Sequence, residues 1–152
     1  MRHNKKFNHL SRTASHRNAM LANMTCSLIM HKRIQTTLAK AKALRVYAEP
    51  IINRAKKDDT NSRRVVFSYL QNKEAVTELF KEISQKIADR PGGYLRIIKL
   101  GIRKSDATEM CCIEFVEYDE NMAKTTKKAT KTRRSRKSSA EKAVAAESAP
   151  AE

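Results

Sequence analysis

The sequence contains no tryptophan, and it has only three glycines, three prolines, four tyrosines and four phenylalanines. Its core must therefore rely on Leu, Ile, Val, Met and Ala. No stretch approaches the roughly 20 consecutive apolar residues that a membrane-spanning helix requires, so we expect no membrane partner. A chain of 152 residues has room for one modest domain and a tail.

Cysteine is also scarce, and its spacing argues against a metal site. The three cysteines are Cys26, Cys111 and Cys112, and none forms the Cys-x-x-Cys pair that is typical of zinc sites. Neighbouring residues of a strand point to opposite faces, so Cys111 and Cys112 do not share a metal or bridge easily. We expect small buried side chains in a reducing compartment, with no metal and no cofactor.

Acidic residues are absent from the first 48 positions, and this is the strongest signal in the chain. The first 48 residues carry ten Lys or Arg and all four histidines, and the first acid is Glu49. Residues 58–120 hold 12 acidic and 10 basic side chains, whereas residues 121–152 hold nine basic and three acidic ones. A cationic surface without internal counter-charges attracts a polyanion. We therefore predict a nucleic acid as the partner.

The N-terminal half shows four successive patterns. Residues 1–10 have no periodicity and are expected to form an extended basic arm. Apolar residues at helical spacing predict a helix over about 12–30, capped by Ser11. The β-branched run 32–36 predicts a strand, and Thr37 can cap the helix that follows.

The second helix should run to about residue 57, either kinked at Pro50 or divided there into two. A short helix is expected before residue 72. Asn72 should then cap an amphipathic helix over about 73–89, and the runs 94–100 and 110–118 should pair as an antiparallel hairpin.

The last 33 residues differ in composition from the rest. From residue 120 the chain is dominated by Lys, Thr, Ser, Ala and Glu, which predicts a disordered tail. The predicted division is thus a nucleic-acid-binding domain over 1–119 and a tail over 120–152.

The segment Gly92-Gly93-Tyr94 suggests a further contact with RNA. Two glycines let a backbone approach another chain closely, and Tyr94 and Arg96 share one face of the predicted strand. That arrangement suits stacking of a base and contact with a phosphate. The alternative is that the glycines only end a helix.

A catalytic site is not expected. The chain has no glycine-rich nucleotide loop and no paired catalytic carboxylates, and the first 48 residues offer no acid to orient His16. We predict that the protein is not an enzyme and has no small-molecule substrate. The alternative is a free nucleic-acid-binding or chaperone protein. Composition alone does not distinguish such a protein from one that is a fixed part of a larger nucleic-acid complex.

Several short motifs occur in an order that resembles a known family. They are Met1-Arg-His, Ser15-His-Arg-Asn-Ala-Met20, Arg33-Ile-Gln-Thr-Thr37, Lys40-Ala-Lys42, Leu44-Arg45, Glu49-Pro50, Arg63-Arg64 and Gly92-Gly-Tyr94 with Arg96-Ile97. Over about residues 1–118 the chain resembles the ribosomal protein L17 family of the bacterial large subunit.

The resemblance implies an α+β fold, a two-layer α/β domain in the order helix, strand, three helices, two strands. The strand near 32–36 would join the hairpin in a small mixed three-stranded sheet. The resemblance also implies a structural role in the cytoplasmic bacterial ribosome, with large-subunit ribosomal RNA and neighbouring large-subunit proteins as partners.

The basic pattern and the resemblance together predict the residues that contact RNA. They are Arg2, His3, Lys5, Lys6, Arg12, Ser15, His16, Arg17, Asn18, Lys32, Arg33, Thr36, Thr37, Lys40, Lys42, Arg45, Arg63, Arg64, Tyr94 and Arg96.

Overall fold

The computed structural model describes residues 8–118, so most of the predicted arm and the whole predicted tail lie outside the described residues. The elements follow one another as α1 (Ala14–His31), β1 (Arg33–Thr37), α2 (Leu38–Arg54), α3 (Thr60–Leu70), α4 (Lys73–Glu78), a π-helical turn (Leu79–Ile83), α5 (Ser84–Lys86), β2 (Leu95–Ile102), β3 (Glu109–Phe115) and a 3₁₀ turn (Val116–Tyr118). Because α4, the π-helical turn and α5 are continuous, the predicted α+β order is confirmed.

The three strands form an entirely antiparallel sheet in the order β1-β3-β2. The prediction that β1 joins the hairpin is confirmed, but the prediction of a mixed sheet is wrong. β1 and β2 do run in the same direction, yet each pairs with β3 between them, so no parallel ladder forms. A bulge interrupts β2 between Lys99 and Gly101, and Gly101 supplies the positive φ of 114° there.

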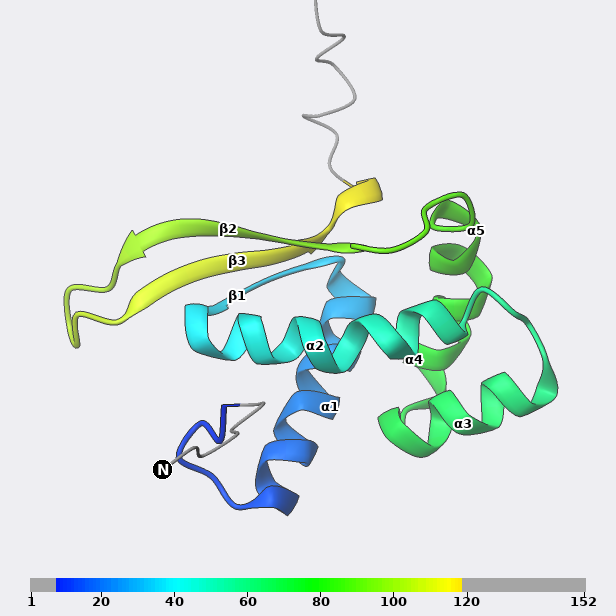
Figure 1. The fold of residues 1–152 in the computed structure, drawn as a ribbon, viewed down its shortest axis with the longest axis horizontal. Coiled ribbons are helices and arrows are strands. Elements are labelled where there is room, and N and C mark those ends of the chain that lie inside the picture. Colours follow the sequence, from blue (N-terminus) through cyan, green and yellow to red (C-terminus); the bar gives the residue numbers. More distant parts are fainter. Residues whose placement is uncertain (1–7, 119–152) are drawn as a thin grey trace, which may run out of the picture. The chain divides into compact units, whose positions relative to one another are not determined.

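One face of the sheet packs on the helices. The side chains of Cys111, Ile113 and Phe115 alternate along β3 and are fully buried in the core. Helix α2 runs along this face and contacts β2 and β3, and the hairpin loop projects beyond the N-terminal end of α2 (Figure 1). The opposite face carries Glu114 and Cys112, which alternate with the core residues.

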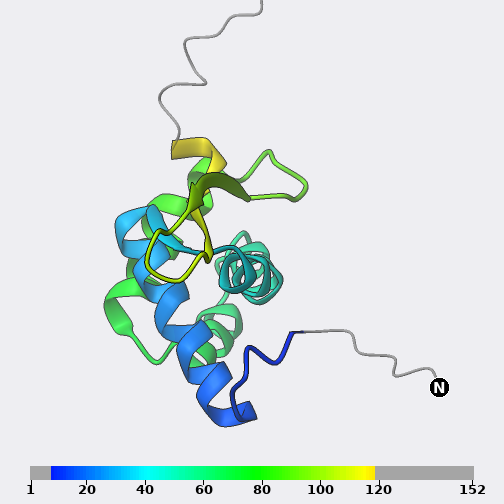
Figure 2. The same cartoon turned by 90° about the vertical axis from the view of Figure 1, so that its left-hand side faces the viewer.

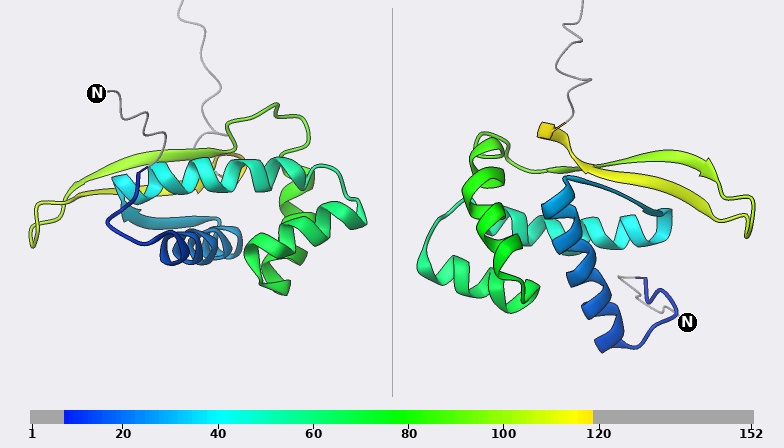
Figure 3. Two further views of the ribbon diagram at one scale, coloured as in Figure 1. Left: turned by 60° about the horizontal axis from the view of Figure 1, so that its bottom comes forward. Right: turned by 180° about the vertical axis from the view of Figure 1, so that it is seen from behind.

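The helices bury stripes at the spacing that the sequence predicts. In α2 the buried positions are Ala41, Leu44, Ala48, Ile51 and Ile52, which recur at intervals of three and four. Helix α1 contacts both α2 and α4. Seen from behind, α1 and the α4–α5 stretch lie side by side in front of α2 (Figure 3).

Helix α2 is continuous through Pro50, which answers the question that the sequence left open. Proline removes the hydrogen bond to the carbonyl of Val46. Pro50 and Val46 are both exposed, so water can satisfy that carbonyl without breaking the helix.

The helix starts agree only partly with prediction. Thr13 and not Ser11 is the N-cap of α1, because Leu10 and Ser11 have positive φ and belong to the preceding turn. Thr37 occupies the N-cap of α2 as predicted, but its hydroxyl makes no capping hydrogen bond. Asn72 caps α4 as predicted, since its Oδ1 accepts from the N–H of Ala75 at 3.0 Å.

The predicted helix over 73–89 contains a π-helical turn at Leu79–Ile83. The predicted apolar stripe is nevertheless confirmed, because every member is buried. Its members are Val76, Leu79, Phe80, Ile83 and Ile87. The wider turn keeps Leu79, Phe80 and Ile83 on the core side.

The cysteines are free and buried, as predicted. Burial raises the pKa of the Cys26 and Cys111 thiols, which keeps them protonated and poor metal ligands. Within residues 8–118, no three His, Cys, Asp or Glu side chains are placed to hold a metal ion. The same part of the chain contains no helix that is long and apolar enough to cross a membrane.

Candidate nucleic-acid interface

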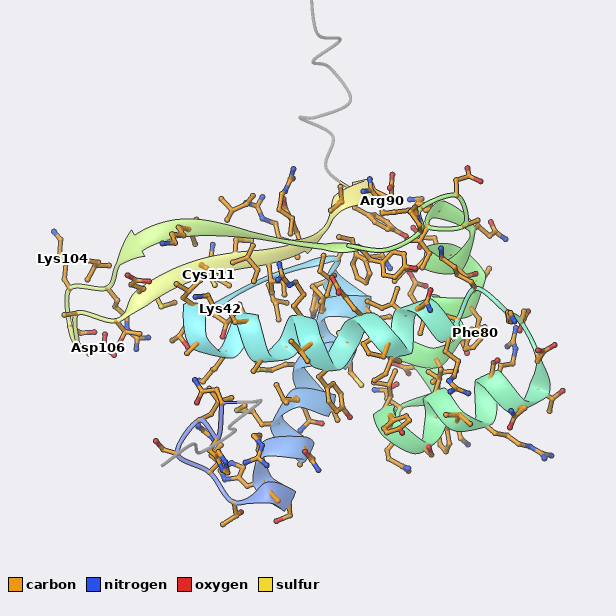
Figure 4. The ribbon with its side chains drawn as sticks, in the orientation of Figure 1. Lys42, Phe80, Arg90, Lys104, Asp106 and Cys111 are labelled. Atoms are coloured by element: carbon orange, nitrogen blue, oxygen red, sulfur yellow. The ribbon has the colours of Figure 1, made fainter. Side chains whose placement is uncertain are left out.

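Four of the predicted RNA-contacting residues line one groove. This groove of about 790 Å³ lies between the N-terminal halves of α1 and α2 and reaches the hairpin loop. Figure 2 faces this end of the domain. The predicted residues on its wall are Arg17, Asn18, Thr37 and Lys42, the last of which is labelled in Figure 4. Segments separated by about 20 positions thus contribute to one surface.

The turn before α1 holds two arginines in place. Arg12 Nη1 donates to the carbonyl of Leu10 at 2.9 Å, and Arg17 Nη1 donates to the carbonyl of Arg12 at 3.3 Å. The backbone N–H of Arg12 donates to the carbonyl of His9 at 3.2 Å. These contacts fix the orientation of both side chains beside the start of α1.

Polar and cationic groups beside the groove face solvent. Ser15, His16 and Asn18 are exposed on the first turns of α1. On α2, Lys42 and Arg45 are exposed, and neither has an ion-pair partner among residues 8–118. Lys40 is half-buried. No acidic residue lies in the first turn of α2, and Glu109 is the one acidic residue on the described wall of the groove.

Arg33 and Arg96 lie elsewhere, on the open face of the sheet. They flank Glu114 across the three strands, because Arg33 and Arg96 are both register partners of that residue. The Glu114 carboxylate is 3.2 Å from Arg33 Nε and 2.5 Å from Arg96 Nη2. Arg33 also donates to the Cys112 sulfur at 2.9 Å. The two arginines therefore bracket one nearly buried carboxylate, with a net positive charge remaining.

The Lys32 side chain makes its contacts within the protein. Lys32 ends α1 in the left-handed conformation, and its ammonium forms a short ion pair with Glu78 and donates to the carbonyl of Ile29 at 2.9 Å. The Lys32 side chain is only 18% exposed. An ammonium committed in this way joins α1 to α4 and is poorly placed for a phosphate.

The Lys32 ion pair is part of a wider network. Tyr118 donates to Glu82 at 2.9 Å, and the Lys86 ammonium lies 3.8 Å from the Tyr118 ring centroid. Hydrogen bonds with Glu78, Tyr118 and Lys86, together with the nearby charge of Lys32, lower the pKa of Glu82 to about 2. Burial and the hydrogen bond to Glu82 raise the pKa of Tyr118. Cations and acids on this side neutralise each other.

The predicted stacking of a base on Tyr94 does not fit the structure. The residue is 2% exposed, and its hydroxyl donates to Asn53 Oδ1 at 2.7 Å. The Lys56 ammonium lies 5.0 Å from the ring centroid. Tyr94 is a core residue that ties the start of β2 to α2. The two glycines before it lie in the loop between α5, which ends at Lys86, and β2, so they do not end the helix directly.

The two arginines of α3 differ. Arg63 forms a bidentate pair with Asp58 at 2.5 and 2.8 Å, and it lies 4.8 Å from the Phe80 ring centroid. The hydrogen bonds that Arg63 donates to Asp58 raise the pKa of the Arg63 guanidinium. Arg64 is exposed.

Thr36 of β1 is half-buried, and its carbonyl accepts from Cys111 at 3.4 Å.

Some groove residues were not predicted. Val46 and Tyr47 of α2, and Thr108 and Glu109 of the hairpin, also form its wall. Val46 is 72% exposed. The sequence does place this apolar residue beside Arg45 on a basic helix, and that position could have marked it as a surface residue. The approach of the hairpin to α2 has no local sequence signal. Arg2, His3, Lys5 and Lys6 lie outside the described residues.

Comparison with known proteins identifies the family. The ribosomal protein L17 family pattern matches residues 20–116. A Bacteroides thetaiotaomicron protein named large ribosomal subunit protein bL17 is 71% identical over 153 residues, covering 99% of this chain and 94% of the relative. The protein of the same name from Phocaeicola vulgatus is 73% identical over 134 residues, covering 87% and 83%. That from Porphyromonas gingivalis is 63% identical over 153 residues, covering 100% and 95%. The chain belongs to the ribosomal protein L17 family.

Proposed function

We propose that this protein is a structural constituent of the large ribosomal subunit and that it binds large-subunit ribosomal RNA through α1, α2 and the basic residues that precede them. Membership of the family makes it a structural, non-enzymatic ribosomal protein, located with the ribosome in the bacterial cytoplasm. Neighbouring large-subunit proteins are the further partners that we propose.

The observation that carries the proposal is the convergence of acid-free segments on one groove. The groove joins Arg17 and Asn18 of α1 to Thr37 and Lys42 of the α2 start. Lysine and arginine neutralise phosphates and release condensed counterions. Side-chain hydroxyls and amides beside them suit sugar, phosphate and base-edge contacts. Such a surface has no evident use in a protein without an anionic partner.

The proposed interface contains only part of the predicted set. Its centre is Arg12, Ser15, His16, Arg17, Asn18, Thr37, Lys40, Lys42 and Arg45, with the N-terminal residues Arg2, His3, Lys5 and Lys6 added on sequence grounds. Arg33 and Arg96 extend it across the open sheet face, and Arg64 extends it along α3. Lys32 and Arg63 are left out because each is neutralised by acids of its own, whereas Arg33 and Arg96 share the single carboxylate of Glu114. Thr36 is left out because its carbonyl accepts from Cys111 within the sheet, and Tyr94 because it is buried.

Ribosome sedimentation tests the proposal. A tagged full-length chain is expressed in Bacteroides thetaiotaomicron, and gradient fractions are probed for the tag. We expect the chain to sediment with large subunits through a moderate salt wash. A chain found only at the top of the gradient would contradict the proposal. Nucleic-acid capture that survives removal of ribosomes would instead favour the free nucleic-acid-binding alternative.

A further inference from the structure

The groove between α1 and α2 has a shape that phosphate contact alone does not require. A basic surface that only tracks a backbone needs no hollow, and exposed lysines on a convex helix would suffice. Here the hollow measures about 790 Å³, within the range of about 300–1,000 Å³ that is typical of pockets for small organic ligands. Its volume therefore admits more than a phosphate.

The wall of the groove has two chemical parts. Its apolar part includes Leu38, Val46 and the half-buried ring of Tyr47. The polar groups belong to Asn18, Thr37 and Thr108, with Arg17 and Lys42 as cations. The Thr37 hydroxyl is not used to cap α2, so it remains able to donate and accept.

Apolar surface, hydrogen-bonding groups and cations match the three parts of a nucleotide. Unstacked bases of RNA are bound by apolar or aromatic surface and by hydrogen bonds to their edges, while lysine and arginine hold the phosphate. We propose that the groove accepts one unstacked nucleotide of the RNA, with its base against Leu38, Val46 and Tyr47 and its phosphate near Arg17 and Lys42.

Glu109 gives the groove a preference for bases that present N–H donors. It is the one acidic residue on the described wall, and it stands at the start of β3. A carboxylate accepts from amino or imino N–H groups and repels a phosphate. Its position beside Thr108 therefore places the hydrogen-bonding edge of the base toward the hairpin, while the face of the base contacts α2 and the phosphate lies away from Glu109, toward Arg17 and Lys42.

This inference rests on the proposed function, and its test separates the two. Full-length protein is bound to protein-free large-subunit ribosomal RNA from Bacteroides thetaiotaomicron. Base-specific reagents such as dimethyl sulfate report the Watson–Crick edges, and hydroxyl radicals report the backbone. The groove is filled by Ala39→Leu, since Ala39 is exposed and lines it. Ala88→Leu adds the same group at an exposed position outside the groove.

A second variant protects the test against a folding defect. Val46→Met also fills the groove without adding an aromatic face on which a base could stack, and the large exposure of Val46 keeps the longer side chain out of the core. Both filled variants keep every cation, so the salt dependence of binding should not change. Circular dichroism melting of each variant checks that the domain stays folded.

We expect the wild type and Ala88→Leu to protect an unpaired base inside the backbone footprint. Ala39→Leu and Val46→Met should lose that protection, keep the backbone footprint, and bind about tenfold more weakly, as expected for loss of one stacked base. Unchanged base protection in both filled variants would overturn the inference, as would a wild-type footprint without any protected unpaired base. A wild type that leaves no backbone footprint would contradict the proposed function itself.

Discussion

The two sides of this domain use lysine and arginine in opposite ways. Beside the groove, Lys42 and Arg45 face solvent without an ion-pair partner among the described residues. Around α4 and α5, Lys32 and Lys86 are held by Glu78, Glu82 and Tyr118. Cations close to acids neutralise each other within the fold, whereas cations in acid-free segments stay available for an external anion. Charge count alone does not separate these cases.

The largest expected effect comes from removing charge on the groove side. Changing Arg17, Lys42 and Arg45 to alanine should weaken binding to large-subunit ribosomal RNA about 10- to 100-fold at moderate salt, and it should lower the salt slope by about two to three. Filter binding over a salt series measures both quantities. The matched control removes Lys73, Lys81 and Lys86 from the other side and should change affinity less than about threefold.

A smaller effect should distinguish two lysines that are both predicted from the sequence to contact RNA. One should affect the stability of the fold and the other the affinity for RNA. Lys32→Met leaves Glu78 without its partner and should lower the free energy of unfolding by about 1–2 kcal/mol, with RNA affinity nearly unchanged. Lys42→Met should do the reverse, because Lys42 is exposed and lines the groove. Urea unfolding and filter binding are measured on both variants. An equal loss of RNA affinity in the two variants would contradict the assignment of the two lysines to different roles.

The smallest effect concerns the two helix starts. Asn72→Ala removes a capping hydrogen bond and should lower the free energy of unfolding by about 1 kcal/mol. Thr37→Ala should change it by only a few tenths, because the Thr37 hydroxyl makes no capping bond, but it should weaken RNA binding. Chemical unfolding of the two variants measures the difference. A Thr37 variant as destabilised as the Asn72 variant would show that this hydroxyl serves the fold.

Local patterns predicted the elements well. The stripe of Ile83 and its neighbours, the Asn72 cap and the hairpin all follow from spacing and turn chemistry within short windows. The resemblance placed β1 with the hairpin, but the antiparallel pairing of β1 with β3 depends on residues about 80 positions apart. No local pattern reports that register.

The candidate site was predicted in outline and misassigned in detail for the same reason. Lys32 looked like its basic neighbours, but its partner Glu78 is 46 positions away. Tyr94 looked available for stacking, but it donates to Asn53, 41 positions away. The groove itself arises only when α1, α2 and the hairpin meet. Local sequence reports which groups are present, and tertiary packing decides which of them remain free.

Tethered hydroxyl-radical cleavage tests the difference between the two sides most directly. The native cysteines are buried, so an iron chelate reacts selectively with an introduced exposed thiol, at Arg45→Cys on α2 or Gln85→Cys on α5. Both labelled proteins are bound to large-subunit ribosomal RNA, and strand breaks are mapped. We predict strong local cleavage from position 45 and little from position 85. Stronger cleavage from position 85 would contradict the account.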